Sequence, residues 1–113
     1  MAKFIILMRE DDNAWSKMPK EEQKALLARY HEWVGQLRAQ GILLSGEPLG
    51  SCARLLRMVS GVIHEEPYTR SQQTLTGFFV IDAEDLAAAT RIARGCPALI
   101  HGETVEVREV GHI

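Results

Sequence analysis

The chain lacks the short motifs that would assign a metal site. It has two cysteines in 113 residues, Cys52 and Cys96, and no CxxC pair; its four histidines form no HxxxH pair. A zinc site requires closely spaced Cys or His ligands. We therefore expect no metal, and we expect both cysteines to remain reduced thiols, because the sequence shows no secretion signal.

An excess of one charge and a long hydrophobic run are also missing. The 13 basic and 15 acidic residues give a net charge of -2 and are scattered along the chain. Without a basic block, the sequence argues against a nucleic-acid partner. The longest N-terminal apolar run, Phe4 to Met8, is five residues. That is too short for a signal-peptide core or for a membrane helix of roughly 20 residues, so we expect a cytoplasmic protein with no membrane contact.

What the chain does contain is sufficient apolar material for one core. Its hydrophobic fraction is 46%, and no repeat, linker or low-complexity stretch divides it. A length of 113 residues is typical of one domain, so we expect residues 1–113 to fold as a single domain.

Hydrophobic periodicity predicts the order of the elements. Apolar residues recur at helical spacing between Pro19 and Gln40, and Gly41 follows where a helix end is expected. Ser60-Gly61 predicts a hairpin turn, and residues 45–50 predict a turn after a short strand. The expected strands and helices cover residues 3–9 (strand), 19–40 (helix), 42–44, 53–59, 62–63 and 74–81 (strands), 86–93 (helix) and 104–110 (strand).

This order predicts an α+β fold of the βαββαβ type with an extra hairpin in mid-chain. Two helices that each follow a strand should cover one face of a single antiparallel sheet. The other face would then expose apolar side chains to water unless a second copy packs on it. We therefore expect a homodimer.

The segment from His64 to Gln73 is the candidate site loop. Its sequence is HEEPYTRSQQ, and the apolar strand LTGFFVID follows it directly. Loops that lead into core strands often carry functional residues. A small-molecule site is therefore expected in or near this loop.

The whole chain resembles the YCII-related family, in particular its DGPF branch. The similarity lies in the helix RYHEWVGQLRAQG leading to ILLSGEPL, in the loop and strand described above, and in the terminal GETVEVREV. The resemblance implies a ferredoxin-like fold that dimerises into an α+β barrel. The branch's Asp-Gly-Pro-Phe signature falls on Glu65, Glu66, Pro67 and Tyr68, so that only the proline is identical.

The same resemblance implies a general acid/base pair, made of a histidine on the first helix and an acidic residue near the loop. His31 and Glu65 are the equivalent catalytic candidates, although Tyr30 competes with His31 for the histidine position. Histidine suits this role because its pKa lies near neutrality. The alternative is that His31 lies at the boundary of the core without a functional role and that Glu65 and Glu66 are simply solvated.

Four further side chains are candidates for substrate binding. A tyrosine can offer its ring and its hydroxyl to a ligand, and an arginine can bind a carboxylate through two hydrogen bonds. Each could equally serve packing or lie on the surface. The candidates are Tyr30, His64, Tyr68 and Arg70.

Two functions remain open from the sequence. The first is a small lyase or isomerase that uses acid/base chemistry on a small organic molecule, without a cofactor, in a cleft of the homodimer. The second is a non-catalytic dimeric module that binds a small ligand or has a regulatory role, which the altered signature favours.

Overall fold

The computed structural model describes residues 1–10, 14–50, 52–68 and 74–111. Its strands are β1 (Ala2–Glu10), β2 (Leu43–Pro48), β3 (Arg54–Val59), β4 (Val62–Pro67), β5 (Thr74–Ala83) and β6 (Thr104–Glu109). Its helices are α1 (Ala14–Lys17), α2 (Lys20–Ala39), α3 (Leu86–Ala93) and the 3-10 helix η1 (Pro97–His101).

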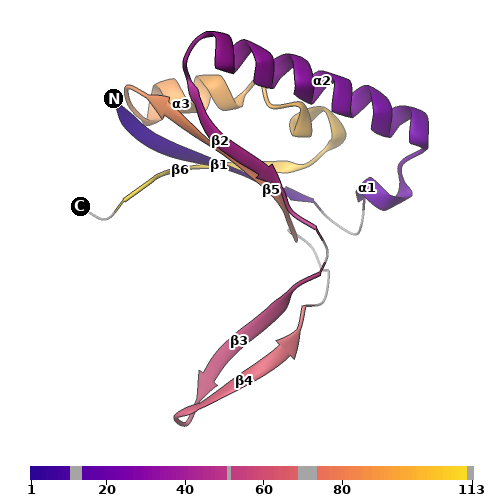
Figure 1. The fold of residues 1–113 in the computed structure, drawn as a ribbon, viewed down its shortest axis with the longest axis vertical. Coiled ribbons are helices and arrows are strands. Elements are labelled where there is room, and N and C mark those ends of the chain that lie inside the picture. The colour runs from indigo at the N-terminus through magenta and orange to yellow at the C-terminus, as the bar shows by residue number, and fades with distance from the viewer. Residues whose placement is uncertain (11–13, 51, 69–73, 112–113) are drawn as a thin grey trace.

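The main sheet has four strands in the order β2-β5-β1-β6, and each neighbouring pair is antiparallel. Helices α2 and α3 lie on one face of this sheet (Figure 1). Removing β3 and β4 from the chain order leaves βαββαβ, and the two central strands β1 and β5 are the first and third of that series. The predicted ferredoxin-like α+β fold and the extra mid-chain hairpin are confirmed.

The core lies between the sheet and α2. Phe4, Ile6 and Met8 alternate along β1 with half-buried residues, so that one face of the strand points into the core. Trp33 and Leu37 of α2 pack onto this face, as the helical spacing predicts. The predicted helix 19–40 is therefore correct to within about one residue at each end.

A bulge interrupts the pairing of β1 with β5 at the end of the sheet where the chain enters α1. Met8 pairs with Gly77 and Arg9 pairs with Leu75, so Thr76 is the extra residue. A bulge re-aims the side chain of its extra residue and often occurs beside active sites. Here it leaves the Thr76 hydroxyl free to hydrogen-bond across the sheet end.

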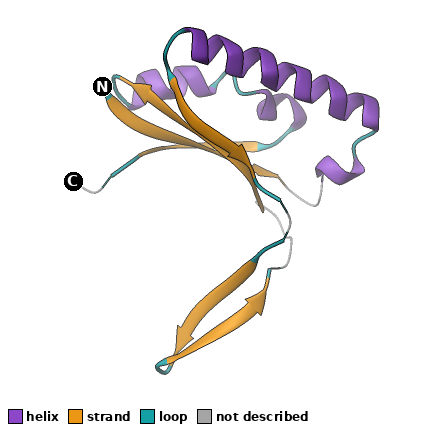
Figure 2. Cartoon of the chain, viewed as in Figure 1, coloured by secondary structure: helices purple, strands orange, loops and turns teal. Residues whose placement is uncertain are grey.

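Strands β3 and β4 form a separate two-stranded sheet that projects from the main sheet (Figures 1 and 2). Its turn has positive φ at both Ser60 (51°) and Gly61 (79°), the geometry of a type I′ turn, so the predicted hairpin turn is confirmed. The radius of gyration is 16.0 Å, against about 13 Å for a compact domain of roughly 100 residues, because the hairpin extends away from the core.

Two expectations from the sequence are corrected. Residues 64–67 were expected in a loop, but they belong to β4 and pair with β3. Residues 45–48 were expected in a turn, but they continue β2 along the edge of β5 as far as Pro48. Residues 45–48 pair with a strand far along the chain, and residues 64–67 pair with the strand before a tight turn. A local composition rich in Gly, Pro and Glu does not reveal either pairing.

Both cysteines are free thiols, as expected.

Candidate functional site

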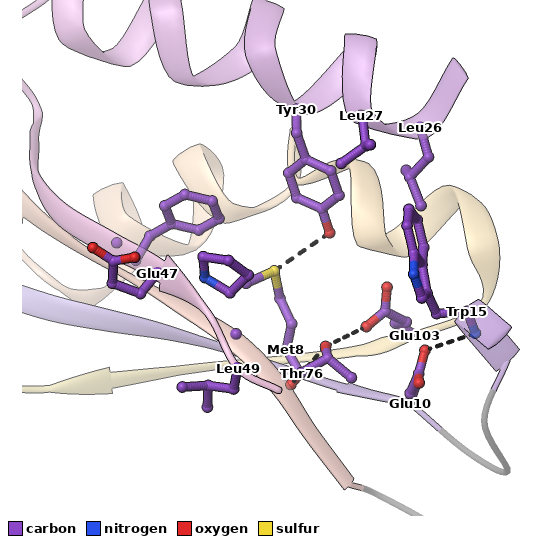
Figure 3. A pocket seen from close by; sticks show the side chains of 14 residues that line it. Met8, Glu10, Trp15, Leu26, Leu27, Tyr30, Glu47, Leu49, Thr76 and Glu103 are labelled. Carbon is purple, nitrogen blue, oxygen red and sulfur yellow. Dashed lines mark hydrogen bonds between the residues drawn. The ribbon is translucent and has the colours of Figure 1, made fainter. Parts of the chain in front are cut away.

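A cavity of about 390 Å³ lies between the N-terminal half of α2 and one end of the sheet. Figure 3 shows side chains from α1, α2, β1, β5 and the segment before β6 meeting around it. Residues that are distant in the sequence thus line one space, which is open to solvent on one side. They are Met8, Glu10, Trp15, Leu26, Leu27, Tyr30, Gly46, Glu47, Pro48, Leu49, Thr76, Gly77, Phe79 and Glu103.

Glu103 is the acidic group held most directly at the cavity. Gly102 ends η1 with a left-handed backbone (φ 77°), and this turn brings the chain back so that Glu103 stands just before β6. The Thr76 hydroxyl donates to Glu103 Oε1 at 2.8 Å. Burial raises the pKa of Glu103 above its ordinary range, and the nearby Glu10 carboxylate raises it further, while the bond from Thr76 opposes both.

Glu10 is a second carboxylate at the same end of the cavity. Only 5% of its surface is exposed, because it continues the inward row of Phe4, Ile6 and Met8 on β1. Its Oε2 accepts a hydrogen bond of 3.2 Å from the Trp15 backbone N–H. This bond ties the short helix α1 to the sheet, so that the Trp15 side chain lines the cavity.

The Tyr30 hydroxyl points into the cavity from α2 and donates to Met8 Sδ at 3.4 Å (Figure 3). Burial is the main cause that raises the pKa of Tyr30 well above its ordinary range, and Cys96, Glu103 and Glu10 raise it further. Tyr30 is therefore a neutral phenol at physiological pH. A thioether is a weak acceptor, so the hydroxyl can donate instead to a ligand oxygen or nitrogen.

The Cys96 thiol is buried and interacts with Tyr30. It is 2% exposed, and burial raises its pKa to about 11. The thiolate form, which is the nucleophile, is therefore scarce near neutrality. This argues against covalent catalysis through Cys96.

Aromatic rings form one wall of the cavity. The rings of Tyr30 and Phe79 are stacked, with centroids 6.3 Å apart and an interplanar angle of 26°. Trp33 packs edge-on against Phe79 at 5.2 Å and holds it from behind. Tyr30 and Phe79 both line the cavity, so this part of its wall is aromatic.

Among the candidate site residues that the structure describes, only Tyr30 lines this cavity. His31 is its neighbour on α2 but is exposed and does not line the cavity. His64 and Glu65 are exposed on β4, where Glu65 lies 3.4 Å from Arg54. Within one chain the structure does not bring His31 and Glu65 together at the cavity, and their pairing stays a prediction.

The remaining two candidates lie at the junction between the hairpin and β5. Tyr68 follows β4 and is half-buried, and it does not line the cavity. Arg70 lies outside the described residues. Their predicted roles in substrate binding stay predictions.

The sequence reasoning missed Glu10, Thr76 and Glu103. A signal for Glu10 was present, since it occupies the next inward position after Phe4, Ile6 and Met8. Thr76 could not be found in this way, because its direction depends on a bulge. Glu103 is marked only by a glycine before a strand, which is a weak signal.

The described residues offer no group of three or more His, Cys, Asp or Glu side chains arranged to hold a metal ion. No helix in the described part of the chain combines the length and the apolar character needed to cross a membrane.

A family model described as the YCII-related domain matches residues 2–112. Among solved structures, one that is similar is 5-chloro-2-hydroxyhydroquinone dehydrochlorinase (TftG) from Burkholderia phenoliruptrix AC1100, in complex with 2,5-dihydroxybenzoquinone. The TM-score is 0.53 and the identity is 14%, over 98% of this chain and 95% of that chain. At this identity the likeness shows a shared fold. No curated protein matches the chain significantly.

Proposed function

This chain belongs to the YCII-related family, and from that premise we propose that it is a small-molecule enzyme of the lyase or isomerase type. It transfers a proton to and from a small organic molecule bound in the cavity, using its own acidic side chains and no resident cofactor. The observation that carries the proposal is Glu103, a carboxyl of raised pKa that is held in position inside a largely apolar cavity.

Glu103 is the proposed proton acceptor. Burial makes its carboxylate a stronger base than a solvated one, and a catalytic group works best when its pKa lies close to the working pH. The bond from Thr76 fixes the Oε1 atom and leaves Oε2 for the substrate. In an isomerisation the proton returns to another carbon; in an elimination a leaving group departs with its electron pair.

Tyr30 is the proposed hydrogen-bond donor. Its phenol is neutral, and its present acceptor is a weak one, so it can bond to a substrate oxygen on which negative charge develops. Glu103 and Tyr30 thus supply the two roles that carbon-acid chemistry requires. The shared fold with a dehydrochlorinase makes elimination a chemistry to test first.

We further propose that the working form is a homodimer of the single domain 1–113. No helix that the structure describes covers the sheet face opposite α2 and α3 (Figure 1). Ile5 pairs with Val80 and Leu7 pairs with Phe78 at the centre of the sheet, and these apolar residues alternate with the core row on β1 and so belong to that face. Packing two such faces together would bury them.

The test is solvent deuterium exchange. The protein is incubated in D₂O with a panel of small ketones, aminoketones and hydroxylated aromatic compounds, and incorporation is followed by NMR and mass spectrometry. We expect at least one compound to exchange or to eliminate, and we expect Glu103→Gln to slow that reaction by about 100-fold or more. Tyr30→Phe should slow it less, because it removes one hydrogen bond.

Glu109→Gln is the matched control, because Glu109 lies on β6 close in sequence to Glu103 but is exposed and does not line the cavity. It should leave the rate unchanged. An exchange rate that Glu103→Gln does not alter would refute the role of Glu103. A compound that binds in the cavity and neither exchanges nor eliminates would instead support the non-catalytic ligand-binding alternative.

A further inference from the structure

The charge on the cavity wall is of one sign. Its lining includes Glu10, Glu47 and Glu103, and among the described residues that line it there is no lysine, arginine or histidine. Glu10 is almost fully buried and Glu103 is half-buried, so water screens them weakly. A ligand that brought a carboxylate or phosphate into this space would meet like charge and no cationic partner.

The aromatic wall favours the opposite charge. The faces of aromatic rings attract cations, and the stacked rings of Tyr30 and Phe79 line the cavity, as Trp15 does. Figure 3 shows Trp15, Tyr30 and Glu103 converging on the cavity from α1, α2 and the segment before β6. A cationic group placed there would have ring faces and a carboxylate within reach together.

The geometry points to an organic cation as the ligand of this cavity, namely a protonated amine on a small apolar body. This inference shares one assumption with the proposed function, namely that the ligand binds in this cavity. It adds that the ligand is positively charged. The amine lies among the ring faces and the acidic lining of Glu10 and Glu103, and the apolar body lies against the aliphatic side chains that also line the cavity, Leu26, Leu27 and Leu49.

The test compares three probes of matched shape by isothermal titration calorimetry: benzylammonium, benzyl alcohol and benzoate. We expect benzylammonium to bind at least about tenfold more tightly than benzyl alcohol, because one charge-assisted hydrogen bond and a cation–π contact together amount to that factor or more. Benzoate should bind most weakly of the three.

Two variants locate the preference. Glu103→Gln keeps the size of the side chain, can still accept from Thr76 and removes the charge, so the ratio of benzylammonium to benzyl alcohol affinity should fall about tenfold. Glu10→Gln is a second variant, in case the first is poorly folded by circular dichroism, and it should lower the same ratio. Glu109→Gln should not change it.

Benzoate binding as tight as that of benzylammonium would overturn the inference, and so would failure of all three probes to bind. An affinity ratio that neither Glu103→Gln nor Glu10→Gln lowers would also overturn it. The proposed function can fail separately from this inference. Cation-selective binding without deuterium exchange would refute the enzymatic function and support the cationic ligand. Exchange confined to anionic substrates would support the enzymatic function and refute the cationic ligand.

Discussion

Glu103 shows how a single carboxyl is set apart from the other acids of the chain. Glu65 and Glu66 pair with arginines, but they stand on an exposed hairpin where ion pairs contribute little. Glu103 is half-buried, faces Glu10 and receives one short hydrogen bond. Its environment disfavours the ionised form of the carboxyl group. Ionised Glu103 therefore lowers the stability of the fold, and it is a stronger base than a solvated carboxylate.

Removing the charge of Glu103 should therefore stabilise the protein. Because its pKa is raised in the folded state, the folded chain holds this proton more tightly than the unfolded chain does. Stability is then lost as the pH rises through the titration of Glu103. We expect the free energy of unfolding of Glu103→Gln, relative to the parent, to increase with pH above the ordinary carboxyl range of about 4.3 and then level off.

Urea unfolding at a series of pH values measures this difference. The Glu109→Gln control should show no such rise, because Glu109 is exposed. A Glu103→Gln variant that grows less stable with rising pH would mean that the ionised carboxylate stabilises the fold, and Glu103 would then be a structural residue. If Glu103 is a functional acid, Glu103→Gln should be more stable than the parent and should turn over substrate more slowly.

At the scale of single residues, the sequence predicts which face of a regular helix or strand a residue occupies, but it does not predict where side chains point at bulges and turns. Tyr30 was a candidate because it competes with His31 for the family's histidine position, and the helix places Tyr30, not His31, at the cavity. Glu10 follows the alternation of β1, but the predicted strand ended at residue 9. Thr76 and Glu103 depend on a bulge and on a left-handed glycine, and no periodicity reports either.

At the scale of elements, the hairpin is the part of the chain that stands alone. Strands β3 and β4 contact each other and make few contacts with the remaining described elements. They expose large apolar side chains, at 66% for Leu56, 69% for Met58 and 65% for Ile63. An isolated two-stranded hairpin is only marginally stable in water. The stability of the hairpin should thus depend on its turn. A substitution in that turn should change the stability of the hairpin without changing that of the main sheet.

Ser60→Asn should strengthen the hairpin. Ser60 has φ of 51°, and asparagine is enriched several-fold in this region, which corresponds to about 0.5 kcal/mol. Hydrogen exchange by mass spectrometry should show slower exchange over β3 and β4 and no change over β1 and β5. Ser60→Val is the opposing control, because a β-branched residue resists positive φ. Equal changes in the hairpin and the main sheet would contradict their independence.

The elements themselves were largely predictable, because each has its own pattern. The apolar run of β1, the stripe of α2 and the Ser-Gly turn all agree with the structure. The HEEP segment was misjudged because its charges suggest solvent, and both faces of β4 are indeed solvated. A strand exposed on both faces has no hydrophobic alternation to reveal it.

At the scale of the whole molecule, the proposed dimer depends on the sheet face that α2 and α3 leave uncovered. Helices α2 and α3 lie on one face of the sheet (Figure 1). Phe78 pairs with Leu7 at the centre of the sheet, and both residues belong to the opposite face. Around this apolar centre lie charged groups such as Arg9 and Glu106, whose side chains are 3.3 Å apart. An apolar centre with a charged rim is the usual composition of a protein interface.

Phe78→Lys should therefore separate the proposed dimer into monomers. A charge placed at the centre of a buried interface costs several kcal/mol per subunit, so the dimer dissociation constant should rise by at least about 100-fold. Ile100→Lys makes the same chemical change at a side chain that is 61% exposed on η1 and away from this face, and it should leave the dimer intact. Sedimentation velocity distinguishes the two outcomes, with circular dichroism to confirm folding. A parent protein that sediments as a monomer, or a folded Phe78→Lys variant that remains dimeric, would show that the sheet face is not the interface.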